Sequence, residues 1–261
     1  MDRSFLSSDK LIKATRDFVC IRTATYEDKQ EAAFLEWAFV GSTGGELRNF
    51  GYCILSPDGK TKLRRSVRGP NFLYANSGAM AADLKQITAQ YQNRTTTNAS
   101  SQSVPQMKSV RLGINVASCD GLPSVVVFGK DQAEVDSLNQ KLSTVIWDEQ
   151  LAGKFIYAST TNSVDLKNIS GARGKTGILI IKPDAFGIKG QLIQAIDPEL
   201  SGDQLKQSLL TAANTFKRIS KTHGLHVRSG RQTGTHWKTE VPVPTRQRKT
   251  TRGGQNPRSR K

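Results

Sequence analysis

The sequence predicts an α/β fold that is used twice and is followed by a basic C-terminal tail. Apolar runs at 18–21 and 54–58 are echoed in the same order by runs at 155–158 and 180–184, and the later run of each pair ends in Pro-Asp. Helix-like segments flank each pair. With 261 residues, 36% of them hydrophobic, the chain can bury two cores of about 100 residues each.

Composition sets the predicted domain boundaries. Two domains are expected, at 1–91 and 109–216. Residues 92–108 are rich in Ser, Thr, Asn and Gln and lack periodicity, which predicts a linker. Residues 217–261 mix Lys and Arg with Gly, Ser, Thr, Gln and Pro, so they cannot bury a core, and we expect this tail to be disordered.

The expected elements of the first half are a helix at 9–17, a strand at 19–25, a helix at 28–40, strands at 50–55 and 61–67, and a helix at 77–91. The two later strands form a hairpin because Pro57 presets one turn residue and Gly59 accepts a positive φ. The last helix follows from the helical spacing of Met80, Leu84 and Ile87.

The expected elements of the second half are strands at 110–118 and 124–128, a helix at 131–147, a strand at 154–160, a hairpin over 178–196 that is broken at 183–190, and a helix at 201–216. Ser201 is the predicted N-cap of the last helix, whose inward face includes Leu205 and Leu209. After Arg218 the apolar periodicity stops.

Positive charge is concentrated at the carboxyl end. The formal net charge is +16, but residues 217–261 hold thirteen Lys or Arg and a single acid, Glu240. The tail therefore carries +12 and the first 216 residues only +4. Such a segment binds polyanions by releasing their counterions.

At residues 2–11, running into 17–22, the chain resembles thioredoxin-like proteins just downstream of their active-site cysteines. The resemblance covers 2–91 and 110–216 and implies two tandem thioredoxin-like domains, each a central mixed sheet flanked by helices. In that family a strand delivers a Cys-x-x-Cys motif to a helix N-terminus, whose dipole and free amides lower the thiol pKa. The sequence contains no Cys-x-x-Cys.

The chain departs from this family in two further ways. It begins where the first strand and the dithiol should already have passed, either because they were lost or because the open reading frame starts further upstream. The family's cis-proline before the hairpin corresponds to Gly51 in the first domain and to Thr176 or Gly177 in the second. The loop 129–132, which should carry the second dithiol, has no cysteine. The resemblance therefore implies two redox-inert domains that serve as an interaction scaffold.

The three cysteines leave an alternative open. Cys20 and Cys53 lie in apolar runs and are expected to be small buried hydrophobes. Cys119 lies at a predicted strand end and is the candidate for a reactive thiol, although its neighbour Asp120 disfavours a thiolate. The alternative function is a thiol-redox or peroxide-handling protein that uses Cys119 or an active segment upstream of Met1.

The tail supplies the candidate binding residues. The expected anion-binding residues are Lys217, Arg218, Lys221, Arg228, Arg231, Lys238, Arg246, Arg248, Lys249, Arg252, Arg258, Arg260 and Lys261. Trp237 is the candidate for stacking on an unpaired base. RNA is favoured over duplex DNA because no recognition helix is evident. Other uses of the tail are solubility, a nuclear address, or salt-sensitive self-association.

No cofactor is expected, and a binding protein is favoured over an enzyme. All three histidines, His223, His226 and His236, lie in the tail, where they form only a weak metal site, and neither domain has a histidine for a Ser-His-Asp arrangement. The N-terminus lacks a signal-peptide core and no apolar run reaches the roughly 18 residues of a membrane span. We expect a soluble cytoplasmic protein, or a secreted or periplasmic one if the true N-terminus lies upstream.

Overall fold

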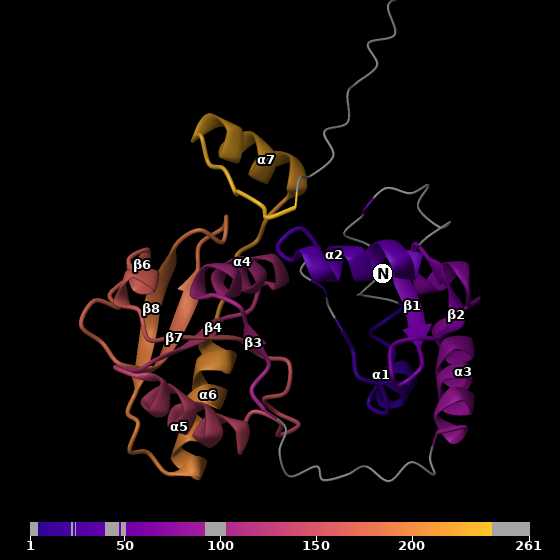
Figure 1. The fold of residues 1–261 in the computed structure, drawn as a ribbon, viewed down its shortest axis with the longest axis horizontal. Coiled ribbons are helices and arrows are strands. Elements are labelled where there is room, and N and C mark those ends of the chain that lie inside the picture. The colour runs from indigo at the N-terminus through magenta and orange to yellow at the C-terminus, as the bar shows by residue number, and fades with distance from the viewer. Residues whose placement is uncertain are drawn as a thin grey trace, which may run out of the picture. The chain divides into compact units, whose positions relative to one another are not determined.

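A computed structural model describes residues 5–21, 23, 25–39, 47, 51–91 and 103–241. The chain divides into two compact units, which are described separately: unit 1 comprises residues 1–95 and 238–261, and unit 2 comprises residues 96–237. Across the described residues the fold is a mixed α/β structure with seven α-helices (Figure 1).

The elements of unit 1 are α1 (Asp9–Thr15), α2 (Lys29–Phe39), β1 (Tyr52–Leu55), β2 (Lys62–Val67) and α3 (Ser77–Ala89), with a 3-10 turn at Pro70–Phe72. Strands β1 and β2 pair antiparallel. Their turn is closed by the Ser56 N–H, which donates to the Thr61 carbonyl at 2.8 Å, and Gly59 has a φ of +70°. The predicted hairpin is confirmed.

The core of unit 1 lies between α1 and α3. Leu11 of α1 is buried with Met80, Leu84 and Ile87, the apolar positions that predicted α3. The Asn76 side chain accepts a hydrogen bond from the Ala79 N–H at 2.9 Å and so caps the start of α3. Both predicted helices are confirmed.

The strand predicted at 19–25 is wrong for the residues that can be described there, 19–21, 23 and 25, none of which lies in a strand. Val19 is 89% exposed and Ile21 is 72% exposed. Apolar, β-branched residues favour strands, but a strand also needs a partner to pair with. Cys20 is exposed rather than buried, so that prediction is wrong as well.

The elements of unit 2 are β3 (Gln106–Met107), α4 (Val110–Asp120), β4 (Ser124–Phe128), α5 (Gln132–Ser143), β5 (Ile156–Thr160), a 3-10 turn (Ser163–Leu166), β6 (Ile169–Ser170), β7 (Gly177–Pro183), β8 (Gly190–Ile196), α6 (Gly202–Thr215) and α7 (His223–Gln232). The six strands form one mixed sheet in the order β3-β5-β4-β7-β8-β6. β3, β5 and β4 are parallel, whereas β7 is antiparallel to both β4 and β8.

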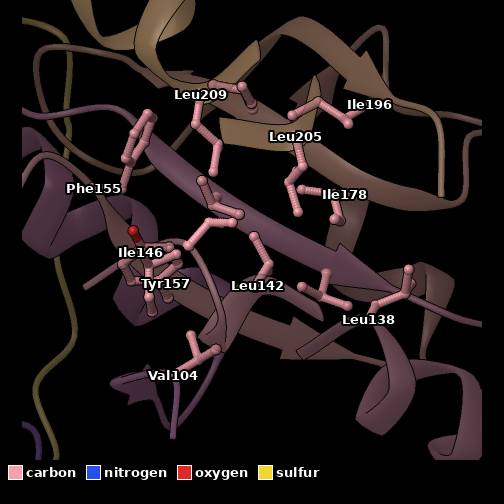
Figure 2. Close-up of a cluster of buried hydrophobic side chains, with 14 of the residues drawn as sticks. Val104, Leu138, Leu142, Ile146, Phe155, Tyr157, Ile178, Ile196, Leu205 and Leu209 are labelled. Atoms are coloured by element: carbon pink, nitrogen blue, oxygen red, sulfur yellow. The ribbon is translucent and has the colours of Figure 1, made fainter. Parts of the chain in front are cut away.

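Helices cover both faces of this sheet, α5 and α6 on one face and α4 on the other (Figure 1). The side chains of β4 alternate between the two cores, since Val125 and Val127 face α5 and α6 while Val126 faces α4. Figure 2 shows the larger core, in which Leu142 of α5 and Leu205 of α6 meet the strand residues. This alternation is why a run of consecutive valines fits a central strand.

Several predicted elements of unit 2 are confirmed: the helix at 131–147 as α5, the strand at 154–160 as β5, and the hairpin at 178–196 as β7 and β8. The helix at 201–216 is confirmed as α6. Its Ser201 side chain accepts from the Gln204 N–H while the Gln204 side chain accepts from the Ser201 N–H, which completes the capping box.

The strand predicted at 110–118 is wrong, because this segment is the helix α4. Ser109 caps its first turn by accepting from the Leu112 N–H at 3.2 Å, and Gly121 ends it with a φ of +67°. Val110, Ile114 and Ala117 are buried on one face at the helical spacing of four and three. The sheet instead gains β3, which lies within the predicted linker.

The segment predicted to be a disordered tail is partly described. Residues 217–241 are placed and contain α7, whereas 242–261 lie outside the described residues. Contacts with the folded part of unit 2, set out below, hold residues 217–237. Composition indicates whether a segment can fold by itself, but not whether packing on another part of the protein can order it.

Candidate anion-binding surface

Charge is segregated across the sheet of unit 2. The α5–α6 face is covered by residues 131–155 and 197–215. Its acidic residues are Asp131, Glu134, Asp136, Asp148, Glu149, Asp197, Glu199 and Asp203, and its basic residues are Lys141, Lys154 and Lys206. The opposite face, here the α4 face, is covered by residues 110–121 and 163–175. It also holds residues 217–237, here the docked segment.

The α4 face is basic. Its charged residues are Arg111, Lys167, Arg173, Lys175, Lys217, Arg218, Lys221, Arg228 and Arg231 against Asp120 and Asp165. The covering segments of unit 2 are thus mainly acidic on the α5–α6 side of the sheet and mainly basic on the α4 side, and such a charge distribution attracts anions to the α4 side.

A buried hydroxyl fastens the docked segment to this face. Lys221 Nζ donates to Ser118 Oγ at 2.7 Å and to the Ser118 carbonyl at 2.9 Å. Ser118 Oγ in turn donates to the Asp184 carbonyl at 2.8 Å. One serine on α4 thus joins the docked segment to the β7–β8 turn. A hydrogen bond to a charged group is among the stronger ones in proteins.

Two further contacts hold the segment. Arg218 lies against Gly121, where any Cβ would collide with the arginine side chain. The His226 ring stacks on Phe186 of the β7–β8 turn, with 4.6 Å between ring centroids and 23° between ring planes. Gly230, one turn further along α7, is buried beside the same phenylalanine. The face of α7 that carries His226 and Gly230 is therefore turned toward the domain.

Trp237 ends the docked segment over α4. The guanidinium carbon of Arg111 lies 3.8 Å from the centroid of the Trp237 ring system, a cation–π contact. One face of the predicted base-stacking residue is thus occupied by an arginine, and a base would have to use the other face or displace that arginine.

The outward face of α7 carries exposed cations. Arg228 and Arg231 are one helical turn apart and both are exposed, as is Leu225, at 62%. Arg231 lies in the last turn, where a cation interacts favourably with the helix dipole. The docking contacts therefore hold the helix that carries two of the predicted anion-binding residues, Arg228 and Arg231.

The structure brings only some of the predicted residues together. Lys217, Arg218, Lys221, Arg228 and Arg231 belong to unit 2, whereas Lys238 belongs to unit 1. In unit 1 the Val241 N–H donates to the Tyr26 carbonyl at 2.8 Å. The other predicted residues, Arg246, Arg248, Lys249, Arg252, Arg258, Arg260 and Lys261, lie outside the described residues.

Sequence reasoning missed the residues that receive the segment: Arg111, Ser118 and Phe186. Their role depends on contacts made across forty or more positions of sequence, and each looks ordinary in its own segment. One local signal could have placed Arg111 and Ser118 on a helix. Gly121 follows their segment, and a glycine after an apolar segment is typical of a helix end.

The cysteines are free in the described structure. Cys53 is half-buried in β1, and burial raises the pKa of its thiol. Cys119 is exposed in the last turn of α4, between Ser118, which binds Lys221, and Gly121, which adjoins Arg218.

The loop 129–132 starts α5. Asp131 accepts from the Glu134 N–H at 2.9 Å and the Glu134 side chain accepts from the Lys130 N–H at 2.9 Å, so the loop builds a helix cap. Thr176 and Gly177 lie where the thioredoxin-like family would have its cis-proline, and Gly177 has a φ of +93°. No peptide bond among the residues described here is cis.

His223, His226 and His236 are all described. Within the placed part of the chain, no three His, Cys, Asp or Glu side chains gather into a group that could hold a metal ion. His226 instead makes the ring contact with Phe186.

Comparisons with models of protein families, with curated proteins and with solved structures found no match. Of the helices that the structure describes, none is long and apolar enough to cross a bilayer.

Proposed function

We propose that this chain is a non-catalytic binding protein that holds a polyanion, with RNA as the favoured partner, on the α4 face of unit 2 and on the basic residues that follow it. The observation that carries the proposal is the docking of residues 217–237. It fixes Arg228 and Arg231 on the basic side of a domain whose other side is acidic. Such polarity steers and orients an anionic partner.

The thioredoxin-like resemblance is proposed for unit 2 as its scaffold. Its support is the order of elements: parallel β3, β5 and β4, with α4 and α5 in the crossovers, then the antiparallel hairpin β7–β8 followed by α6. For unit 1, whose described residues contain only the β1–β2 sheet, the resemblance stays a prediction.

RNA is favoured over other polyanions because the cations adjoin an aromatic side chain. Trp237 is half-buried, and the Arg111 guanidinium lies over its ring. Base stacking on an aromatic ring is tolerant of sequence and suits unpaired nucleotides.

The test is salt-dependent binding of the full chain to a single-stranded RNA homopolymer, with duplex DNA and heparin as comparisons. Two changes are made separately: removal of 242–261, which holds seven cations and no acid, and the double substitution Arg228→Gln with Arg231→Gln. The matched control is Lys130→Gln with Lys154→Gln, two exposed lysines of the same unit that lie outside the residues of the α4 face. Truncating at 242 rather than at 217 keeps the docked segment in place.

We expect a weaker affinity and a shallower dependence of log K on log salt, by roughly 0.7 for each phosphate of single-stranded RNA that the protein no longer neutralises. The double arginine variant therefore has a slope shallower by roughly 1.4, and the slope of the control is that of wild type. Equal slopes for the arginine variant and its control would contradict the proposal, and tighter binding of duplex DNA would reject RNA as the partner.

A second candidate function, thiol chemistry at Cys119, is favoured by one observation. The thiol is exposed and two cations, Arg218 and Lys221, contact residues on either side of it. Exposed thiols in electropositive surroundings are the reactive class. Cys20 is an exposed thiol in the same chain and serves as its reference.

The two functions separate by alkylation kinetics and an insulin-reduction assay. A Cys119 alkylation rate about equal to that of Cys20, with insulin reduction blank for both wild type and Cys119→Ser, supports the binding protein. Faster alkylation at Cys119 together with turnover that Cys119→Ser abolishes supports the thiol enzyme.

A further inference from the structure

A shallow groove runs between α1 and α3 of unit 1. It encloses about 350 Å³ and is lined by Lys10 and Lys13 of α1 and by Gly78, Ala81, Ala82 and Lys85 of α3. It belongs to a different unit from the docked segment, and nothing in the proposed function uses it.

The sequence explains why the groove is open. Leu11 and Ala14 of α1 are buried with Leu84 of α3, which sets the two helices side by side. The positions of α3 that line the groove recur every three or four residues, so they share one face of the helix. That face carries glycine and alanines instead of large side chains, so the space beside the helix contact is not filled.

The rim of the groove is positive. Three lysines are among its lining residues and no acidic residue is. Lys10, Lys13 and Lys85 are all exposed, and in the portion of the chain that is placed their side chains make no hydrogen bond or ion pair. Like charges that share a site repel, and an anion between them removes that repulsion.

The floor of the groove is apolar. Ala81 and Ala82 present methyl groups, and lysine side chains expose methylene stems below their charged ends. A ligand that matches both parts has an anionic head at the rim and an apolar body against the floor. The volume lies at the lower end of small-molecule sites, so that body is compact.

We propose that this groove binds a small phosphomonoester with a compact apolar body. A phosphomonoester carries nearly two negative charges at neutral pH and three acceptor oxygens, which suits three lysines that act as separate point charges. The proposal is independent of the polyanion function, because its residues belong to unit 1 and none is in the tail.

The test is a titration of the full chain with hexyl phosphate, followed residue by residue through backbone amide NMR shifts. Two further titrations, with inorganic phosphate and with 1-hexanol, separate the head from the apolar body. We expect saturable shifts at α1 and α3 with hexyl phosphate and much weaker ones with either fragment. A response of the basic tail is read from its own amides and does not enter the fitted affinity.

Three variants sharpen the test. Lys10→Gln with Lys85→Gln should weaken binding roughly fivefold or more, since two exposed ammonium groups no longer attract the phosphate. Ala82→Leu should weaken it to a similar degree by filling the groove while every charge stays in place. The control, Lys29→Gln with Lys60→Gln, removes two exposed charges elsewhere in unit 1 and should bind like wild type.

Fold is checked for each variant by its amide spectrum. An equal affinity for wild type and the Lys10, Lys85 variant would overturn the proposal. So would α1 and α3 shifts that inorganic phosphate reproduces in full, because the apolar floor would then have no role.

Discussion

The Arg111 guanidinium lies over the Trp237 ring, 3.8 Å from its centroid, and so ties the last residue of the docked segment to the first turn of α4. This contact joins two positions that are 126 apart in sequence. It holds the C-terminal end of the docked segment against α4, and the Ser118–Lys221 hydrogen bonds hold its N-terminal part against the same helix.

Replacing Arg111 should loosen the docked segment without unfolding unit 2. Arg111→Ala removes a cation–π contact worth about 0.5–1 kcal/mol at an exposed site. Local opening of α7, measured by amide hydrogen exchange, should become easier by that amount. The same exchange in Arg173→Ala, which removes another exposed arginine from the α4 face, should match wild type. Unchanged protection in Arg111→Ala would show that Trp237 is held by other contacts.

Ser118 and Lys221 should act as a coupled pair. Ser118→Ala removes the hydroxyl that accepts from Lys221 and donates to the Asp184 carbonyl, and Lys221→Met removes the ammonium while keeping the stem. Hydrogen bonds to charged groups contribute about 1.5–3 kcal/mol. We expect each single change to ease the opening of α7 and the double change to cost less than the sum of both. Strict additivity in this double-mutant cycle would contradict a direct interaction.

Gly187 should be far less tolerant than Gly174, although both have a positive φ in unit 2. Their φ angles are +66° and +73°. A Cβ at Gly187 would lie 2.7 Å from the Asn115 Cα, whereas no described atom lies within 4 Å of one at Gly174. Gly174→Ala should cost about 1–2 kcal/mol from backbone strain, and Gly187→Ala should cost about 1–3 kcal/mol more from crowding. Urea denaturation measures both, and equal costs would mean that the β7–β8 turn can move away from α4.

Tyr157→Phe should stabilise unit 2. The Tyr157 ring is buried in the larger core of unit 2, and among the described residues its buried hydroxyl has no hydrogen-bond partner (Figure 2). Leaving such a group unsatisfied costs about 1–3 kcal/mol, so deleting it should recover part of that. Urea denaturation should show a higher midpoint for the variant, and a lower midpoint would reveal a partner for the hydroxyl.

The sequence predicted the elements whose signals are local. The Pro57–Gly59 turn and the Ser201 capping box identified a hairpin and a helix, because the residues that make these structures are neighbours. The prediction at 110–118 was wrong because apolar, β-branched residues there fit the pattern of a strand and also that of a helix. Val110 and Ile114 fit a strand as well as a helix, and Ser109 and Gly121 decide for the helix.

The basic tail was recognised from composition, but its docking was not. Lys221 and Trp237 predicted only anion and base contacts, and the partners that hold them, Ser118 and Arg111, come from α4. A segment with little apolar content can be ordered by a surface whose shape depends on the whole sheet, and no local pattern encodes that surface.

Acid should destabilise unit 1 through Asp83. Its carboxylate accepts from Arg64 Nε at 2.9 Å and from the Tyr74 hydroxyl at 2.6 Å, and the hydrogen bonds from Arg64 foremost hold the pKa of Asp83 below its ordinary value. The unfolded chain, with an ordinary Asp pKa of about 3.9, then binds more protons than the folded one in acid. The stabilisation is therefore fully present above the unfolded pKa and is lost as the pH falls through the folded pKa.

Asp83→Asn should lower the stability of unit 1 at neutral pH and flatten its pH dependence below about pH 4. The measurement is urea denaturation at a series of pH values, followed through amide signals of unit 1. Asp17→Asn, which removes an exposed carboxylate of the same unit, should leave most of the acid dependence in place. If Asp83→Asn kept the acid dependence of the wild type, the contacts of Arg64 and Tyr74 would not be the source of that stability, since only a carboxylate there can take up the proton.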